Sequence, residues 1–276
     1  LISRVKLTHK GSLITYGLAQ MPGDTTKQNL NNIDFAYCPQ CHHKLNYSFY
    51  HYGHLGNFSC PNCSFKRNPL NYEAENINLV NKTMQINNKI IKLNKDATYV
   101  AYATLAAYTL AKTINIPEDK IILALNQDQI SSKRGQTLLL ANRPLTMLET
   151  KNENNLSYYQ SIKYICDAPG TKTVILGFEN VSRRYKLNDL SWLYDVDFEM
   201  FKDHQDIDKF FCIGRFRYDV ATRLSYAGID PKKIVLIDHI EELLNIVKKE
   251  STGSIYTMVC FDMTGIIKEM INHEND

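Results

Sequence analysis

Four cysteines in the first quarter of the sequence have the spacing of a metal site. Cys38 and Cys41 are separated by two residues, and so are Cys60 and Cys63, which follow after an interval of eighteen residues. Two such pairs at this distance are typical of a tetrahedral thiolate zinc site. Because four thiolates fill every ligand position, we expect the zinc to be structural and not catalytic.

Two other interpretations of this segment are less favoured. A histidine could replace one cysteine ligand, although the four-cysteine set is already complete. The histidines within reach are His42, His43, His51 and His54. Disulfide bonds are less favoured still, because we predict a cytoplasmic location.

Aromatic residues surround the cysteines, and they have two possible roles. They are Tyr47, Phe49, Tyr50, Tyr52, Phe58 and Phe65. They could form a platform on which nucleic-acid bases stack. A ribbon of about thirty residues has almost no core, however, so it needs aromatic side chains to cover its own hairpins. Only Lys44, Lys66 and Arg67 supply positive charge nearby, and we therefore favour the structural role.

A second group of candidate residues lies in the segment NDLSWLYDVDFE, residues 188–199. Asp189 precedes a run that predicts a helix, and an aspartate in that place can be an N-cap. Asp195, Asp197 and Glu199 stand at alternate positions and could bind a metal ion. We interpret these three carboxylates as an acidic helix start with a solvated face.

The composition indicates what kind of protein must position these residues. The chain has 276 residues, of which 44% are hydrophobic, so it can bury a sizeable core and is long enough for two domains. No run approaches the roughly 18 apolar residues of a membrane helix, and the first residues lack a secretory signal, which predicts a cytoplasmic protein. The net charge of +3 is spread along the chain and does not favour a nucleic-acid partner.

Elements of the first region follow from periodicity. Residues 77–95 alternate apolar and polar side chains around Asn87-Asn88, which predicts a hairpin. Residues 98–112, TYVAYATLAAYTLAK, predict a buried helix. Pro117 begins a second helix, with acidic residues in its first turn.

After about residue 140 the pattern changes, and we place a domain boundary there. Short apolar strands are predicted within residues 171–179, 208–216, 232–240 and 254–262. Amphipathic helices are predicted within 218–229 and 239–250. Strands that alternate with helices at this spacing predict a parallel sheet with crossover helices.

Together, these features resemble the MurT-type Mur ligase-like subunits of lipid II isoglutaminyl synthase. The similarity rests on the four-cysteine ribbon, the LAAYTLAK helix and the Asp-Leu-Ser-Trp segment, and it covers nearly the whole chain. It implies an α/β fold with two domains. Residues 1–140 would be part of a Mur ligase central domain, with a zinc ribbon inserted at 35–68, and residues 141–276 a Rossmann-like parallel-sheet domain. The opening LISRVK resembles the residues after the family's Asn-Ala-Asp-Asp-Pro segment, so we expect the chain to begin partway through the central domain.

The resemblance also implies an activity, cofactors and partners. The family enzyme amidates the D-glutamate α-carboxylate of the peptidoglycan stem peptide on lipid II, with ATP and Mg²⁺, and a GatD-type glutaminase supplies the ammonia. Asp189 matches the aspartate that orients the histidine of the glutaminase triad. Such a carboxylate fixes the imidazole tautomer and stabilises the imidazolium ion. An N-cap role for Asp189 remains the alternative.

Three further residues are implied in substrate or nucleotide contacts. Arg134 matches an arginine of the family's interdomain linker, which contacts nucleotide or substrate or only joins the domains. Lys151 and Asn152 match the start of the family's Lys-Asn-Pro-Ala-Gly turn. Elsewhere the sequence departs from the family. No phosphate-loop motif occurs in the 276 residues, and Val100 and Ala103 replace two asparagines near the start of the helix.

These departures leave more than one function open. The leading hypothesis is a divergent MurT-type ligase subunit whose glutaminase-docking role is better preserved than its ATP chemistry. The first alternative is a non-catalytic scaffold paralogue that binds the glutaminase without an ATP-dependent reaction. The second and weaker alternative is a zinc-ribbon module that binds nucleic acid.

Overall fold

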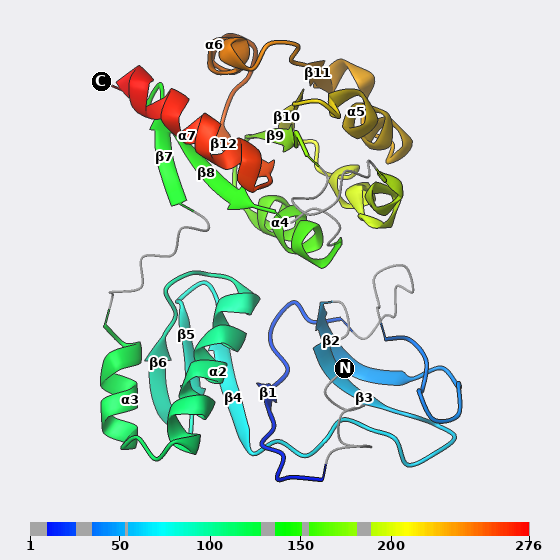
Figure 1. The fold of residues 1–276 in the computed structure, drawn as a ribbon, viewed down its shortest axis with the longest axis vertical. Coiled ribbons are helices and arrows are strands. Elements are labelled where there is room, and N and C mark those ends of the chain that lie inside the picture. The colour runs from blue at the N-terminus through cyan, green and yellow to red at the C-terminus, as the bar shows by residue number, and fades with distance from the viewer. Residues whose placement is uncertain are drawn as a thin grey trace. The chain divides into compact units, whose positions relative to one another are not determined.

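The computed structural model describes residues 10–25, 35–52, 55–127, 136–150, 155–180 and 189–275. The chain divides into two compact units, Leu1–Ser131 and Ser132–Asp276 (Figure 1). The second unit includes strand β7, Gln136–Leu140, which pairs with the strand that follows it. The boundary near residue 140 that the sequence pattern suggests would separate this strand from its own sheet.

A four-stranded sheet and two helices form one part of the first unit. The strand order is β1-β4-β5-β6, and only the β1–β4 pair is parallel. The elements are β1 (Tyr16–Leu18), β4 (Tyr72–Asn78), β5 (Thr83–Ile86), β6 (Lys89–Lys92), α2 (Thr98–Thr113) and α3 (Glu118–Leu125). The predicted hairpin and both predicted helices are confirmed.

Local sequence explains these elements. Asn87 and Asn88 link β5 to β6 with φ angles of 48° and 60°, and asparagine tolerates this left-handed conformation in a two-residue hairpin turn. Ala101, Leu105 and Tyr108 lie on one face of α2 and are fully buried. That face packs with buried side chains of β1, β4, β5 and β6 in a single core.

The cysteine-rich segment of the first unit is a small, separate layer. Strands β2 (Asn46–Tyr52) and β3 (Leu55–Ser59) pair in an antiparallel ribbon. Its core consists of buried aromatic side chains and cysteines, among them Phe35, Tyr47, Tyr50, Phe58 and Phe65. Phe49 is also buried. Five of the six aromatic residues singled out in the sequence are thus buried in the ribbon, as the structural interpretation predicted; they are Tyr47, Phe49, Tyr50, Phe58 and Phe65.

The second unit contains a six-stranded sheet. Its order is β11-β10-β9-β12-β8-β7, and every pair is parallel except β7–β8. The strands after β7 are β8 (Arg143–Glu149), β9 (Lys172–Gly177), β10 (Ile207–Ile213), β11 (Ile234–Leu236) and β12 (Ser254–Val259). The sheet is thus mixed, whereas the sequence predicted a parallel one. Ala141 and Asn142, with φ angles of 49° and 63°, make a tight turn that reverses the chain between β7 and β8.

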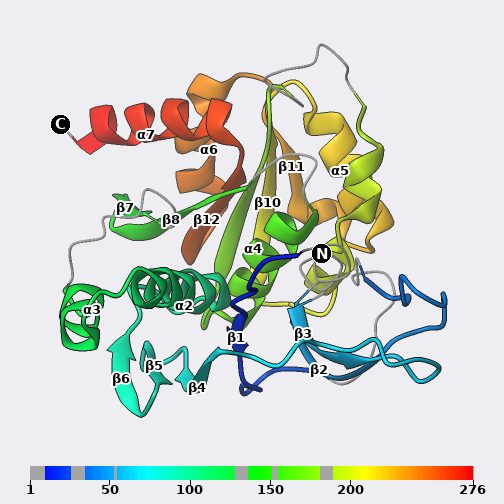
Figure 2. The same cartoon turned by 60° about the horizontal axis from the view of Figure 1, so that its bottom comes forward.

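Helices cover both faces of this sheet (Figure 2). They are α4 (Asn155–Asp167), α5 (Arg217–Tyr226), α6 (Leu243–Glu250) and α7 (Phe261–Asn275). One core joins buried residues of α4 and α5 to one face of the sheet, and a second core joins α6 and α7 to the other face. Alternate residues of β10 belong to different cores, Phe210 to the first and Phe211 to the second, because successive strand side chains point to opposite faces.

The Asp-Leu-Ser-Trp segment differs from the helix that its sequence suggested. It forms two short 3₁₀ helices, η2 (Ser191–Asp195) and η3 (Phe198–Phe201). Leu193, Val196 and Phe198 are buried in the first core of the second unit. Because these apolar side chains do not follow an α-helical stripe, two short turns bury them where one regular helix would not.

Candidate functional site

The structure brings the four predicted cysteine ligands together. The sulfur atoms of Cys38, Cys41, Cys60 and Cys63 all lie within 4.8 Å of one another. The Sγ–Sγ distance is 3.4 Å between Cys41 and Cys60, and 3.6 Å from Cys63 to both Cys38 and Cys41. Tetrahedral Zn–S bonds of about 2.3 Å place sulfurs about 3.8 Å apart. All four cysteines are free of disulfide bonds, so the cluster fits a single ion.

Two similar turns aim these sulfurs. The Gln40 N–H lies 3.4 Å from Cys38 Sγ, and the Asn62 N–H lies 3.4 Å from Cys60 Sγ. Backbone bonds close each turn, from Cys38 N–H to the His43 carbonyl and from Cys60 N–H to the Phe65 carbonyl. Each pair of cysteines is thus held by hydrogen bonds within its own turn.

The thiols influence one another electrostatically. The backbone N–H of His43, with help from neighbouring thiols, lowers the pKa of Cys41 to about 5. For Cys63 the backbone N–H of Phe65 lowers the pKa, but desolvation and the three other cysteines outweigh it and raise the pKa to about 12. One thiolate therefore forms readily, while further ionisation in the same small volume requires a compensating cation.

None of the histidines in the described residues belongs to this cluster. Among the described residues, the four cysteines are the one cluster of potential metal ligands. His43 directs Nδ1 to the Cys41 carbonyl at 3.1 Å, and His51 pairs with Asp24 at 2.7 Å in a buried position. His54 lies outside the described residues.

The second candidate site is Asp189, which begins the segment of short 3₁₀ helices. Its side chain is exposed, and its Oδ1 accepts a hydrogen bond of 2.9 Å from the Ser191 N–H. Hydrogen bonds from the backbone and side chain of Ser191 lower the pKa of Asp189, so this carboxylate is ionised at neutral pH. The N-cap position of η2 is Leu190, so Asp189 lies one residue before it and supports the start of η2 through this hydrogen bond, while its side chain remains accessible from solvent.

Buried aromatic groups hold this segment. The Trp192 ring packs against Tyr158 and Phe178, with ring centroids 5.3 Å and 5.5 Å away. Leu193 is 1% exposed. The residues that follow Asp189 are therefore fixed to the core of the second unit.

Arg223 on α5 also holds the segment that follows Asp189, and it was not predicted from the sequence. Its guanidinium donates to the carbonyls of Leu193 at 3.1 Å and Val196 at 2.7 Å, and to the Glu199 carboxylate at 2.8 Å. The signal in the sequence is its position: Arg223 lies three residues after Val220 and one before Leu224, on the apolar stripe of the helix. Glu199 therefore forms an ion pair with Arg223 and is not only part of an acidic surface.

A comparison with known families finds a match within the second unit. Residues 151–263 match the family described as MurT ligase C-terminal. The second unit is therefore similar to a MurT C-terminal domain over these residues. Asp189 and Arg223 both lie within the matched residues.

Relatives of known name extend this resemblance along the chain. The MurT subunit of lipid II isoglutaminyl synthase (glutamine-hydrolyzing) from Staphylococcus aureus is 24% identical over 235 residues, which are 85% of this chain and 52% of the relative. The corresponding subunit from Streptococcus pneumoniae is 22% identical over 243 residues, 87% of this chain and 53% of the relative. The chain spans about half the length of these relatives.

Solved structures show the same kind of fold. A pseudomurein peptide ligase type C from Methanothermus fervidus superposes with a TM-score of 0.64 and 17% identity, over 94% of this chain and 52% of that one. A MurF structure from Acinetobacter baumannii gives a TM-score of 0.56 and 16% identity, over 75% and 46%. The chain therefore has a Mur ligase-like α/β fold, and the resemblance stated from its sequence is confirmed.

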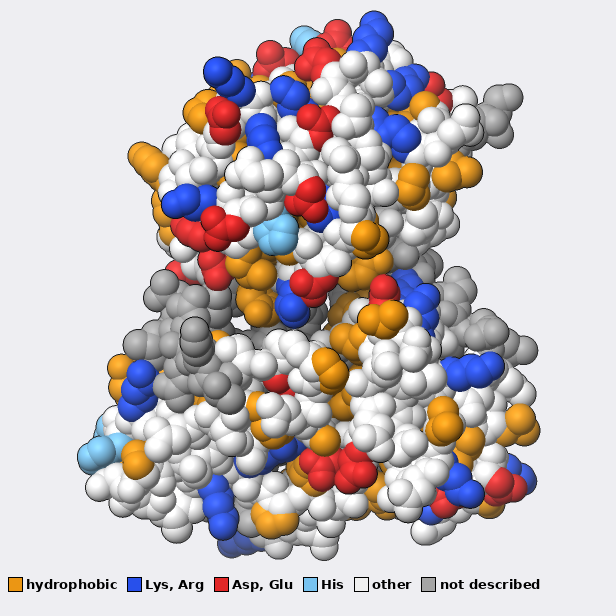
Figure 3. Space-filling model, turned by 180° about the vertical axis from the view of Figure 1, so that it is seen from behind, with side chains coloured by type: hydrophobic (Ala, Val, Ile, Leu, Met, Phe, Trp, Pro, Cys, Tyr) orange, Lys and Arg blue, Asp and Glu red, His pale blue; other side chains and the backbone are white. Residues whose placement is uncertain are grey.

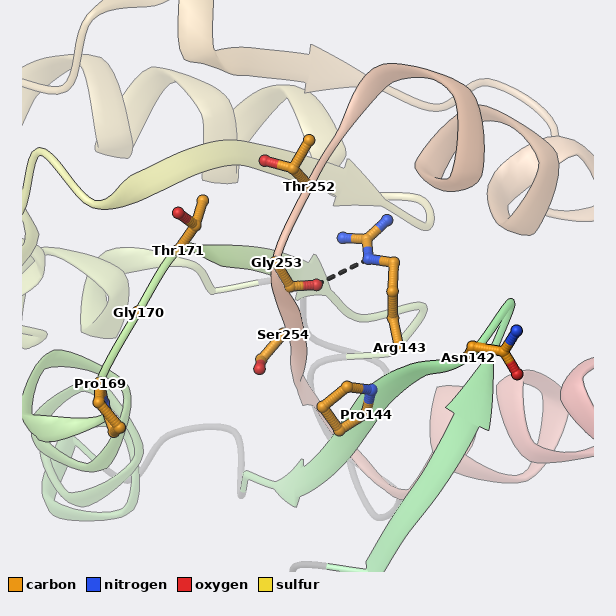
Figure 4. A pocket seen from close by; sticks show the side chains of 9 residues that line it. All are labelled: Asn142, Arg143, Pro144, Pro169, Gly170, Thr171, Thr252, Gly253 and Ser254. Atoms are coloured by element: carbon orange, nitrogen blue, oxygen red, sulfur yellow. Dashed lines mark hydrogen bonds between the residues drawn. The ribbon is translucent and has the colours of Figure 1, made fainter.

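A surface depression of about 460 Å³ lies at the amino-terminal ends of strands β8, β9 and β12 in the second unit (Figure 4). It is lined by Asn142, Arg143, Pro144, Pro169, Gly170, Thr171, Thr252, Gly253 and Ser254. Arg143 donates to the carbonyls of Gly253 at 2.7 Å and Ser251 at 3.0 Å. Ligands of open α/β sheets bind at the carboxyl ends of strands, and this arginine serves its own chain, so we interpret the depression as structural.

The remaining predicted contacts are not covered by the structure. Arg134, Lys151 and Asn152 lie outside the described residues.

In the described part of the chain no helix is long and apolar enough to cross a membrane. On the face shown in Figure 3, lysine and arginine side chains lie among aspartate and glutamate side chains, without the continuous positive surface that a nucleic-acid backbone requires.

Proposed function

We propose that this chain forms part of a MurT-type ligase subunit that works with a GatD-type glutaminase. The reaction would be the ATP- and glutamine-dependent amidation of the D-glutamate α-carboxylate in the stem peptide of lipid II. The match of residues 151–263 to the MurT C-terminal family and the names of the curated relatives support this proposal. ATP and Mg²⁺ would serve the ligase reaction of the full-length enzyme, and Arg134, Lys151 and Asn152 remain proposed contacts for nucleotide or substrate.

In this proposal Asp189 completes the catalytic triad of the partner glutaminase. A nucleophilic cysteine and a histidine belong to the glutaminase, and the Asp189 carboxylate accepts the remaining imidazole N–H. That bond holds the imidazole in the tautomer that can take the thiol proton, and it stabilises the imidazolium ion that results. The observation that carries the assignment is an exposed and ionised carboxylate on a segment fixed by Arg223 and Trp192.

We also propose that Cys38, Cys41, Cys60 and Cys63 bind one Zn²⁺ ion. Their sulfur distances fit a tetrahedral thiolate site, and the ion supplies the positive charge that several adjacent thiolates need. Four protein ligands leave no position for water or substrate, so the ion stabilises the ribbon and takes no part in the reaction.

A substitution at Asp189 tests the triad role. In a complex with the glutaminase, Asp189→Asn keeps the shape of the side chain but presents an amide to the imidazole. We expect glutaminase activity to fall by about 10³- to 10⁴-fold, because the orienting carboxylate is lost, while the complex still forms in size-exclusion chromatography.

Asp195→Asn is the matched control, because Asp195 is also exposed and lies at the end of the same 3₁₀ helix. It should leave glutaminase activity unchanged. A stable complex in which Asp189→Asn retains full activity would contradict the triad assignment.

One observation favours the alternative function, a scaffold without ligase activity. Val100 and Ala103, near the start of α2, have no side-chain group that can hydrogen-bond a nucleobase. An assay for ATP-dependent amidation of lipid II by the assembled complex separates the two functions. A scaffold would support glutamine hydrolysis without ATP consumption, whereas a ligase subunit would couple them.

A further inference from the structure

Two tyrosines expose most of their side chains next to the segment that carries Asp189. Tyr194 on η2 is 59% exposed, and Tyr226 at the end of α5 is 72% exposed. Their ring centroids lie 6.5 Å apart, so they form one aromatic surface. We propose that this tyrosine pair is a main contact of the glutaminase partner, an inference that rests on the function proposed for Asp189.

The geometry of η2 places Tyr194 on the same side of the helix as Ser191, whose N–H donates a hydrogen bond to Asp189. A 3₁₀ helix has three residues per turn, so Ser191 and Tyr194 lie one above the other, about 6 Å apart along the axis. Both are exposed, whereas Leu193 faces the core. Asp189 is bonded to the Ser191 N–H and is only two residues away from it.

The size of a stable interface then determines what the partner covers. A carboxylate that completes a triad must lie within about 3 Å of the partner's imidazole, so the partner surface must reach η2. A standard interface buries about 800 Å² on each protein, which corresponds to a patch of about 16 Å radius. Two extended residues and one 3₁₀ turn separate Asp189 from Tyr194 by at most about 13 Å. A partner whose interface is centred on Asp189 therefore covers Tyr194, and with it the adjacent Tyr226.

Tyr194 is also held in position by the residues around it. The Arg223 guanidinium lies 5.8 Å from the centroid of the Tyr194 ring, while its hydrogen bonds fix the carbonyls of Leu193 and Val196. A rigid aromatic side chain loses little conformational entropy when it is covered, and tyrosine is among the residue types that dominate binding energy at interfaces.

Binding of the full chain to a purified GatD-type glutaminase tests the inference. We expect Tyr194→Ala and Tyr226→Ala each to weaken binding, so that the dissociation constant measured by calorimetry rises by about tenfold or more. Glutaminase activity should return when the variant chain is present at saturating concentration, because Asp189 is untouched. Tyr37→Ala is the control, since Tyr37 has the same exposed fraction of 59% but belongs to the cysteine ribbon.

The possible results separate the two proposals. If the unchanged chain does not bind the glutaminase, the proposed function and this inference both fail. If it binds, and if the single variants and the double variant bind equally well, the tyrosine pair is not a contact, although the triad role of Asp189 can still hold. Circular dichroism of each variant excludes unfolding as the cause of weaker binding.

Discussion

Arg223 is a cation in the core of the second unit, and all the partners of its guanidinium lie in one short segment. Arg223 is 4% exposed, and its guanidinium donates to the carbonyls of Leu193 and Val196 and to the Glu199 carboxylate. A buried charge of this kind is tolerated because it donates to two carbonyls and is paired with a carboxylate. At the scale of single residues, the segment that carries Asp189 is therefore positioned by α5 as well as by its own turns.

Replacing Arg223 should affect stability and function together. Arg223→Ala removes charge-assisted hydrogen bonds to the buried Leu193 and Val196 carbonyls, which then keep only one backbone donor each, and it also removes the packing of the long side chain. We therefore expect the free energy of unfolding to fall by about 3 kcal/mol. Urea denaturation measures this loss. Glutaminase activity in the complex should also fall, because the segment that holds Asp189 loses its support.

Arg223→Lys is the informative comparison. A lysine ammonium can reach one of the acceptors but cannot bridge all three. We expect intermediate stability and intermediate activity. Unchanged stability of both variants would show that the arginine does not support this segment.

At the scale of elements, regular patterns were predictable and irregular ones were not. The cysteine spacing indicated the ribbon, and periodicity indicated α2, α3 and the strands β9 to β12. The hairpin of β7 and β8 was not recognised, because the turn at Ala141 and Asn142 contains no glycine, although both residues have positive φ angles. Helix α7 was also missed, because it begins directly after β12 at Phe261, with no proline or glycine between them. Arg223 could not be assigned, since its acceptors become neighbours only in the folded chain.

The cysteine ribbon offers a prediction at the same scale. The purified chain should contain about one zinc ion per molecule, and Cys60→Ser should lower this ratio strongly, because three thiolates bind zinc less tightly than four. Removing zinc with a strong chelator should also disorder the ribbon, since its small aromatic core depends on the ion. Metal analysis and tyrosine fluorescence report the two effects.

Cys166→Ser serves as the control for this substitution, because Cys166 is a half-buried free cysteine of the second unit. It should leave the zinc content unchanged. If Cys60→Ser retained a full complement of zinc, the four-cysteine site would be wrong.

At the scale of the whole chain, the two candidate sites belong to different units. The cysteine cluster lies in the first unit, with its own aromatic core, and Asp189, Arg223 and the tyrosine pair lie in the second, with a separate core on each face of its sheet. No described side chain of the ribbon core belongs to the clusters of the second unit. Each unit can therefore lose its order without the direct loss of a core residue in the other.

This separation predicts that zinc removal leaves the glutaminase contact intact. After chelation, the ribbon should lose its order, whereas the affinity for the glutaminase and the dependence of its activity on Asp189 should remain within about twofold, because a twofold change corresponds to only about 0.4 kcal/mol. Calorimetry and a glutaminase assay before and after chelation measure both quantities on the full chain, and Cys60→Ser provides the same comparison without a chelator. A large loss of affinity in both experiments would mean that the ribbon contributes to the partner's binding surface. In that case the footprint of the glutaminase would extend to the first unit, and the zinc ion would act on the complex through the shape of the ribbon that it holds.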